Sequence, residues 1–232
     1  MTPRELLARR TAPLRLVIFD CDGVLVDSEP LTNRVIARDL TALGWPMEPS
    51  DAERLFLGMT SEAMIPAVEA RLGIKLADDW LAGFIQRLID AFEAEVEAIP
   101  GALETLQALH RLHIPWRIAS NSSHAEMAAK FKRIGITQLV AGRMHSHHDV
   151  PNGKPAPDIY LAAAAAEGVA PAECLVIEDS ARGVAAAIAA GMQCLGFAPH
   201  SDGAALRAAG AAPFHSMFEL PALIEAARKP HS

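Results

Sequence analysis

The sequence has few cysteines, no long hydrophobic run and no excess of positive charge. Its 232 residues include 3 cysteines, an odd number without the spacing of a disulfide framework or a metal site, so we expect a protein of the reducing cytoplasm. Every apolar run falls far short of the ~18 residues that a membrane span requires, which predicts no membrane partner. Residues 1–13 are charged and lack the apolar stretch of a signal peptide, so we expect a leader before the first strand.

The charge balance narrows the classes of partner. The chain has 21 Lys and Arg against 28 Asp and Glu, a net charge of -7, and so offers no basic field for nucleic acid or an anionic membrane. An anionic small molecule would need local positive charge. We expect a monomer, because no exposed apolar stripe stands out in the sequence.

Short apolar runs alternate with helical patterns over most of the chain. The runs that predict buried strands are residues 14–19, 115–120, 138–142, 174–177 and 193–197. Helical patterns occupy residues 101–112, 126–134, 157–167 and 181–190. This alternation predicts an α/β fold with a Rossmann-like, doubly wound parallel sheet.

Residues 31–99 differ from the rest of the chain. Their apolar residues recur every three or four positions, as in helices, and no strand-like run of any length appears. The Pro100-Gly101 pair that follows is typical of a domain boundary. We therefore predict a catalytic core of residues 1–30 and 100–232 and an inserted α-helical cap of residues 31–99, which acts as a lid and selects the substrate.

Two acids follow the first predicted strand, at residues 20–23 (DCDG). Ligands bind at the carboxyl ends of strands in open parallel sheets. Two carboxylates two residues apart, on a chain that turns at Gly23, can face one site, with Asp20 as nucleophile and Asp22 as proton donor and acceptor. Taken alone, such a motif is a polar turn or a solvated acid pair in most proteins.

Two further motifs at predicted strand ends suit a phosphate group. The Ser120 hydroxyl, with the backbone amide of Asn121, can hold a phosphoryl oxygen at the start of a helix. Lys154 lies in a rigid loop, residues 152–155 (NGKP), and can neutralise both an aspartate and an incoming phosphate. A helix cap and a solvated loop are the respective alternatives.

The pair Glu178-Asp179 ends another predicted strand with two acids. Carboxylate oxygens suit Mg2+, which is held by one or two carboxylates plus substrate phosphate. We expect Asp20 and Asp179 to supply carboxylates and Asp22 a backbone carbonyl as metal ligands. We expect Glu178 to hold these ligands in place without binding the metal itself. A helix cap at Asp179 is the alternative for this motif alone.

All of these motifs are expected at the same edge of the predicted sheet. Together they predict phosphoryl transfer.

In this order and with this insert, the motifs resemble the haloacid dehalogenase (HAD) superfamily of hydrolases. The resemblance is closest to the β-phosphoglucomutase-like branch, whose members are mostly phosphosugar phosphatases. The runs that carry it are residues 20–30 (DCDGVLVDSEP), 153–160 (GKPAPDIY) and 177–180 (IEDS). It implies an aspartyl-phosphate on Asp20, Asp22 as general acid and base, and an essential Mg2+. It also implies phosphate holders at Ser120 and Lys154 and a metal ligand at Asp179 with Glu178 as its helper.

The activity predicted from the sequence is Mg2+-dependent hydrolysis of a small phosphorylated metabolite, a sugar phosphate or a phosphosugar acid. The alternative is a sugar phosphomutase of the β-phosphoglucomutase type. The mutase has a His where this chain has Thr32, and an Arg in the cap loop where counting from Gly58 gives Ser61. Both differences favour the phosphatase.

Two other interpretations explain less of the sequence. A phospho-accepting signalling domain similar to response-regulator receivers would also use an Asp, Mg2+ and a Lys, but it is smaller and would need neither a lid nor Asp22. A transition-metal site is suggested by His145, His147, His148 and Asp149. Because their spacing fits no strong zinc pattern, we interpret this segment as a solvated loop.

Overall fold

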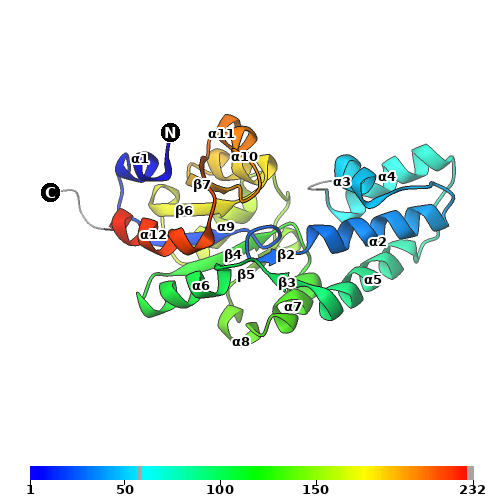
Figure 1. The fold of residues 1–232 in the computed structure, drawn as a ribbon, viewed down its shortest axis with the longest axis horizontal. Coiled ribbons are helices and arrows are strands. Elements are labelled where there is room, and N and C mark those ends of the chain that lie inside the picture. Colours follow the sequence, from blue (N-terminus) through cyan, green and yellow to red (C-terminus); the bar gives the residue numbers. More distant parts are fainter. Residues whose placement is uncertain (57–58, 229–232) are drawn as a thin grey trace. The chain divides into compact units, whose positions relative to one another are not determined.

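The computed structural model describes residues 1–56 and 59–228 (Figure 1). The chain forms two compact units. Unit 1 comprises Met1–Val26, Ala98–Ser123 and the chain from Val140 onward, and unit 2 comprises Asp27–Glu97 and His124–Leu139. Within the described ranges, no helix has the length and apolar character needed to cross a membrane.

Unit 1 is built on a six-stranded parallel sheet with the order β5-β4-β1-β6-β7-β8. Its strands are β1 (Leu16–Phe19), β4 (Trp116–Ser120), β5 (Met144–Ser146), β6 (Cys174–Glu178), β7 (Gln193–Phe197) and β8 (Ala212–Phe214). The register sets Phe19 of β1 opposite Ile118 of β4 and Ile177 of β6. The three central strands therefore end at one edge, and the residues after them are brought together there.

Helices cover both faces of this sheet, which confirms the α/β fold predicted from the sequence. They are α1 (Pro3–Ala8), α6 (Ala102–Arg111), α9 (Asp158–Ala166), α10 (Ala181–Ala189), α11 (Ala204–Ala209) and α12 (Leu220–Arg228). In Figure 1, α10 and α11 lie on one side of the sheet and α6 and α12 on the other. Every residue of β1 is buried, as a central strand between two helical layers requires.

Two expectations about the elements of the chain need correction. The strand expected at residues 138–142 is wrong, because α8 (Thr137–Val140) occupies this segment and the strand, β5, begins at Met144. The buried residues here, Ile136 and Val140, are four positions apart, which is helical spacing. The segment expected to be a leader contains α1, whose Leu6 is buried and which packs against α12 and β8.

Unit 2 is helical. It contains α2 (Glu29–Ala42), α3 (Pro49–Phe56), α4 (Ser61–Leu72), α5 (Trp80–Glu95), α7 (His124–Arg133) and α8. On α5 the buried residues Phe84, Leu88 and Phe92 recur every four positions and form the face that packs inward. Unit 2 thus includes α7 and α8, which the sequence analysis assigned to the core, and α7 packs against α5.

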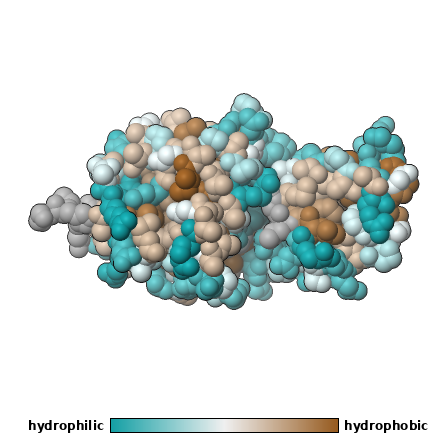
Figure 2. Space-filling view, turned by 90° about the horizontal axis from the view of Figure 1, so that it is seen from above, coloured by the Kyte–Doolittle hydropathy of each residue, from teal (hydrophilic) through white to brown (hydrophobic). Residues whose placement is uncertain are grey.

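Two of the four places where the chain passes from one unit to the other lie in short strands. These are β2 (Val26–Asp27) and β3 (Glu97–Ala98), which pair in a sheet of their own. In the view of Figure 2, the most hydrophobic residues, in dark brown, form only small separate patches among tan, white and teal residues.

Candidate active site

Asp20 follows β1 directly and is nearly buried, with an exposed fraction of 7%. Its backbone N–H donates to the carbonyl of Ile177 at 2.9 Å, which extends the pairing of β1 with β6. The next residues form a tight turn, in which the N–H groups of Leu25 and Val26 both donate to the carbonyl of Cys21, at 2.9 and 3.1 Å. The turn fixes the direction of the chain just after Asp20.

Gly23 lies in this turn and brings Asp179 close to it. Its φ of 73° is in the left-handed region, which favours glycine. A Cβ at this position would overlap the carboxylate of Asp179. Glycine is therefore required both by the turn and by the approach of an acid from the end of β6.

Lys154 places a buried cation between two of the acids. Its Nζ donates to Oδ1 of Asp20 at 2.5 Å and to Oε1 of Glu178 at 2.8 Å, and the side chain is only 5% exposed. The ammonium also lies 4.8 Å from the centroid of the Tyr160 ring. A buried charge is tolerated when it is paired in this way, so the lysine is held in one position.

The backbone of Lys154 is held by two further side chains. The Asn121 amide accepts a hydrogen bond from the Lys154 N–H at 2.9 Å and donates to the Lys154 carbonyl at 3.2 Å. Arg182 donates to the same carbonyl at 2.7 Å. The side chain of Asn121 therefore positions the lysine, whereas phosphate binding by its backbone amide stays a prediction.

Glu178 is fully buried and accepts hydrogen bonds at both carboxylate oxygens. Oε1 accepts from Lys154 and from the hydroxyl of Tyr160, the latter at 2.9 Å. Oε2 accepts from the N–H of Asp179 at 3.0 Å and from the N–H and hydroxyl of Ser180, both at 2.9 Å. Glu178 thus ties the lysine to the loop that opens α10 and carries Asp179.

Asp22 is held by two serine hydroxyls from the loop after β4. Ser120 donates to its Oδ2 at 3.1 Å and Ser122 donates to the same oxygen at 2.8 Å. Ser120 also accepts from the N–H of Ser122 at 2.9 Å. Sequence reasoning missed Ser122, Tyr160 and Arg182, because the signal for each is a long-range contact that the sequence does not display.

Burial and the excess of acids determine the protonation of the cluster. Burial raises the pKa of Asp20 to about 7, although the ammonium of Lys154 opposes this shift. Burial also acts to raise the pKa of Glu178, but Lys154 and the hydrogen bonds lower it more, so that this pKa lies below its usual value. Burial lowers the pKa of Lys154, but the two carboxylates outweigh it and the net shift is upward. Among Asp20, Glu178 and Lys154, Asp20 is therefore the group whose pKa lies near neutral pH.

The donor set fits a hard divalent cation. Carboxylate oxygens of Asp20, Glu178 and Asp179 lie within 4.8 Å of one another. Because Glu178 is engaged by Lys154, Tyr160 and the loop before α10, Asp20 and Asp179 are the carboxylates suited to bind a cation. Oxygen ligands of this kind match the preference of Mg2+.

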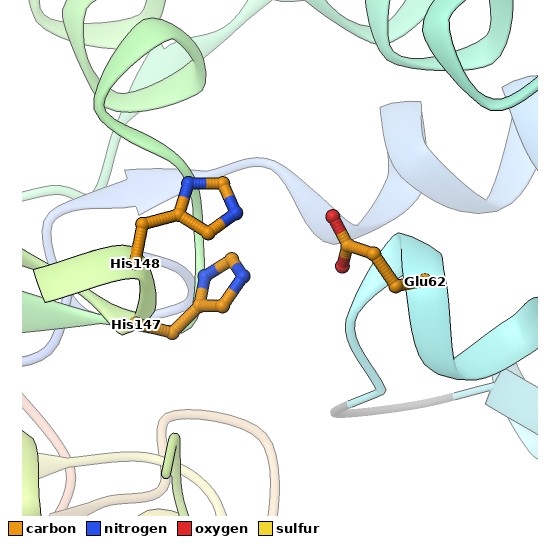
Figure 3. A group of neighbouring side chains, drawn as sticks. All are labelled: Glu62, His147 and His148. Carbon is orange, nitrogen blue, oxygen red and sulfur yellow. The ribbon is translucent and has the colours of Figure 1, made fainter. Parts of the chain in front are cut away.

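The remaining residues singled out by the sequence lie elsewhere. His147 and His148 begin a short 3-10 helix in unit 1, and their ring centroids are 3.9 Å apart (Figure 3). Asp149 accepts a hydrogen bond from the N–H of Ser146 at 2.8 Å and so caps this helix. Ser61 begins α4 in unit 2, and Gly58 lies outside the described residues.

A family model and several known proteins match this chain. The model, described as haloacid dehalogenase-like hydrolase, matches residues 14–191. A phosphorylated carbohydrates phosphatase of Thermotoga maritima is 32% identical over 204 residues, which cover 85% of this chain and 92% of the relative. The 6-phosphogluconate phosphatase of Escherichia coli is 29% identical over 194 residues, covering 81% of this chain and 85% of the relative.

Two further matches differ in how much of the other protein they cover. The chain is 33% identical over 198 residues, 84% of its length, to the Arabidopsis thaliana protein SUPPRESSOR OF QUENCHING 1, chloroplastic, but spans only 19% of it. The crystal structure of a HAD family hydrolase from Deinococcus radiodurans, with bound phosphate and sodium, has a TM-score of 0.75 and is 34% identical. That match covers 95% of this chain and all of the other.

Proposed function

Because the chain belongs to the haloacid dehalogenase-like hydrolase family, we propose that it is a Mg2+-dependent phosphatase of small phosphorylated carbohydrates. The proposed substrates are sugar phosphates and phosphosugar acids. The names of two relatives support this class, since one acts on phosphorylated carbohydrates and the other on 6-phosphogluconate. The phosphate bound in the related Deinococcus structure is consistent with the same chemistry.

The observation that carries the proposal is the meeting of Asp20, Lys154 and Asp179 at one sheet edge. Asp20 is more than a hundred positions from the other two in the sequence, yet Lys154 donates to it at 2.5 Å and Asp179 fills the space left by Gly23. A turn, a surface loop and a helix cap would have no reason to converge. A buried nucleophile, a fixed cation and a second acid are the parts that phosphoryl transfer requires.

In the proposed mechanism, an Asp20 oxygen attacks phosphorus and the bond to the leaving alcohol breaks, which leaves an aspartyl-phosphate. Asp22 donates its proton to the departing oxygen. Asp22 then takes a proton from water as the water oxygen attacks the phosphorus, which releases inorganic phosphate and restores both acids. Lys154 and the Ser120 hydroxyl hold phosphoryl oxygens during both steps.

Asp20, Asp179 and the backbone carbonyl of Asp22 would hold Mg2+, which when bound offsets the negative charge of the phosphoryl group. Asp20 would otherwise repel an incoming phosphate at contact distance. Glu178 keeps Lys154 and the Asp179 loop in place from its buried position. Selection of the substrate by the helical insert, acting as a lid, stays a prediction.

A panel of phosphorylated metabolites tests the proposal. The purified protein with Mg2+ should release inorganic phosphate from one or more sugar phosphates or phosphosugar acids, and EDTA should abolish release reversibly. Conversion of a sugar 1-phosphate into its 6-phosphate isomer would instead establish a mutase. Activity that persists in EDTA would contradict the proposed metal dependence.

A further inference from the structure

We propose that Ser122 is a positioning residue for the general acid and base, Asp22, and that it holds Asp22 while Ser120 binds the phosphoryl group. The inference rests on the proposed function and adds a residue that the motifs do not contain. The argument starts from the contacts of the two serine hydroxyls, which belong to the same loop and reach the same carboxylate oxygen.

The two hydroxyls differ in what else they must do. A serine hydroxyl has one hydrogen and so donates one hydrogen bond at a time. The Ser120 hydroxyl donates to Asp22 in this structure, but the proposed mechanism needs that hydrogen for a phosphoryl oxygen. When Ser120 turns to the substrate, the bond from Ser122 is the one of the two that stays on Asp22. At 2.8 Å it is also the shorter one.

Both backbone polar groups of Ser122 are hydrogen-bonded. The position from which its side chain extends toward Asp22 is therefore fixed. Its N–H donates to the Ser120 hydroxyl oxygen at 2.9 Å, an acceptor that remains when the hydrogen of Ser120 rotates away. Its carbonyl accepts from the hydroxyl of Ser146 at 2.8 Å. Ser146 is fully buried at the end of β5, in register with Ser120 of β4. A rigid strand pair therefore supports the donor.

Loss of this donor should affect the two steps in which Asp22 transfers a proton, departure of the alcohol and attack of water. A misplaced general acid slows departure of a sugar alkoxide, which is a strong base, but not of p-nitrophenolate, which leaves without protonation. Hydrolysis of the aspartyl-phosphate also uses Asp22 and is common to both substrates, but kcat/KM covers only the steps up to departure of the alcohol. The ratio of kcat/KM for a sugar phosphate to kcat/KM for p-nitrophenyl phosphate therefore reports on Asp22 as the general acid. A merely structural role of Ser122 would lower kcat/KM for both substrates together.

The test compares Ser122→Ala, Ser122→Thr and Asp22→Asn with the wild type on both substrates. For Ser122→Ala we expect kcat/KM on the sugar phosphate to fall about 10-fold and kcat/KM on p-nitrophenyl phosphate to stay within about 2-fold of the wild type. Ser122→Thr keeps a hydroxyl and should restore the ratio, whereas Asp22→Asn should lower it further. Ser201→Ala, on an exposed loop, is the matched control and should leave both rates unchanged.

The outcomes separate the inference from the function on which it rests. If the wild type releases no phosphate from any substrate, the proposed function fails, and the role of Ser122 fails with it. If the wild type is active and Ser122→Ala lowers kcat/KM equally for both substrates, only the role of Ser122 is wrong. If the alanine variant does not fold, Ser122→Cys, which donates weakly, should show the same selective loss, and an unchanged ratio would refute the proposal.

Discussion

At the scale of single residues, Lys154 shows how a charge can be built into a protein interior. Removal of an ammonium from water is costly, and the cost is offset here by two carboxylates in direct contact, at 2.5 and 2.8 Å. The pairing also balances part of the negative charge that gathers around Asp20. Lys154 is therefore needed for stability as well as for the proposed binding of phosphate.

Replacement of Lys154 by an uncharged residue should leave the repulsion between Asp20 and Glu178 without a compensating charge. We expect Lys154→Met to lower the free energy of unfolding by about 3 kcal/mol at pH 8 in EDTA, because two buried carboxylates lose their counter-ion. The pKa of Asp20, about 7 in the wild type, should rise further in this variant. Since a proton on Asp20 relieves the repulsion, the deficit should shrink as the pH falls from 8 to 6.

The control for this prediction is Lys132→Met. Lys132 pairs with Glu93 at 2.9 Å on the surface, and 70% of its side chain is exposed. Its replacement should lower the free energy of unfolding by less than about 1 kcal/mol. Urea unfolding at both pH values measures the two effects. An equal loss for both lysines, or a Lys154→Met deficit that grows at lower pH, would contradict the account of the cluster.

At the scale of elements, burial determined what could be predicted from the sequence. The central strands β1, β4 and β6 are mostly apolar and buried, and they were predicted to within two residues. The edge strand β5 is a Met-His-Ser segment, only partly buried, and carries no apolar signal. β8 is short and contains Pro213, which a central strand excludes but an edge strand tolerates.

The first turn of α10 should accept only glycine at position 183. A Cβ on Gly183 would overlap the carboxylate of Glu178, which is itself fixed by Lys154, Tyr160 and Ser180. We expect Gly183→Ala to lower the free energy of unfolding by about 1–3 kcal/mol, because the packed carboxylate of Glu178 must move. We also expect it to slow phosphate release. Thermal or urea unfolding, together with activity, measures both.

Gly83 in α5 is the matched helical glycine. A Cβ there would meet the guanidinium of Arg87 at 3.1 Å, the far end of a flexible side chain. Alanine is a better helix former than glycine. The free energy of unfolding of Gly83→Ala should therefore lie within about 1 kcal/mol of the wild-type value or above it. If Gly183→Ala were as stable as Gly83→Ala, the tight fit around Glu178 would be wrong.

At the scale of the whole molecule, the parallel sheet explains why the site could be outlined from the sequence. Acids and a hydroxyl after apolar runs are expected to meet wherever parallel strands end together, and Asp20, Ser120 and Glu178 do so. The supporting contacts were not predictable. Asn121 clamps the backbone of Lys154, and Tyr160 bonds to Glu178, only because loops far apart in the sequence approach each other.

The cysteines report on the packing of unit 1. All three are buried, and burial raises the pKa of the Cys174 thiol to about 11 and that of Cys194 well above its usual value. At pH 8 about one in a thousand of the Cys174 thiols is then ionised. Native protein should therefore react slowly with a thiol reagent at pH 8, and faster as the pH rises, whereas all three cysteines should react at once in urea. A fast-reacting thiol in the native protein would contradict this packing.

The central claim is that Asp20 is the nucleophile of a site assembled from distant segments around a divalent cation. The most direct test is the rate of phosphate release by Asp20→Asn, in Mg2+ and with the best substrate of the wild type. The account predicts a folded protein whose rate falls at least about 1000-fold, because the amide cannot form the covalent intermediate. A rate within tenfold of the wild type would contradict it.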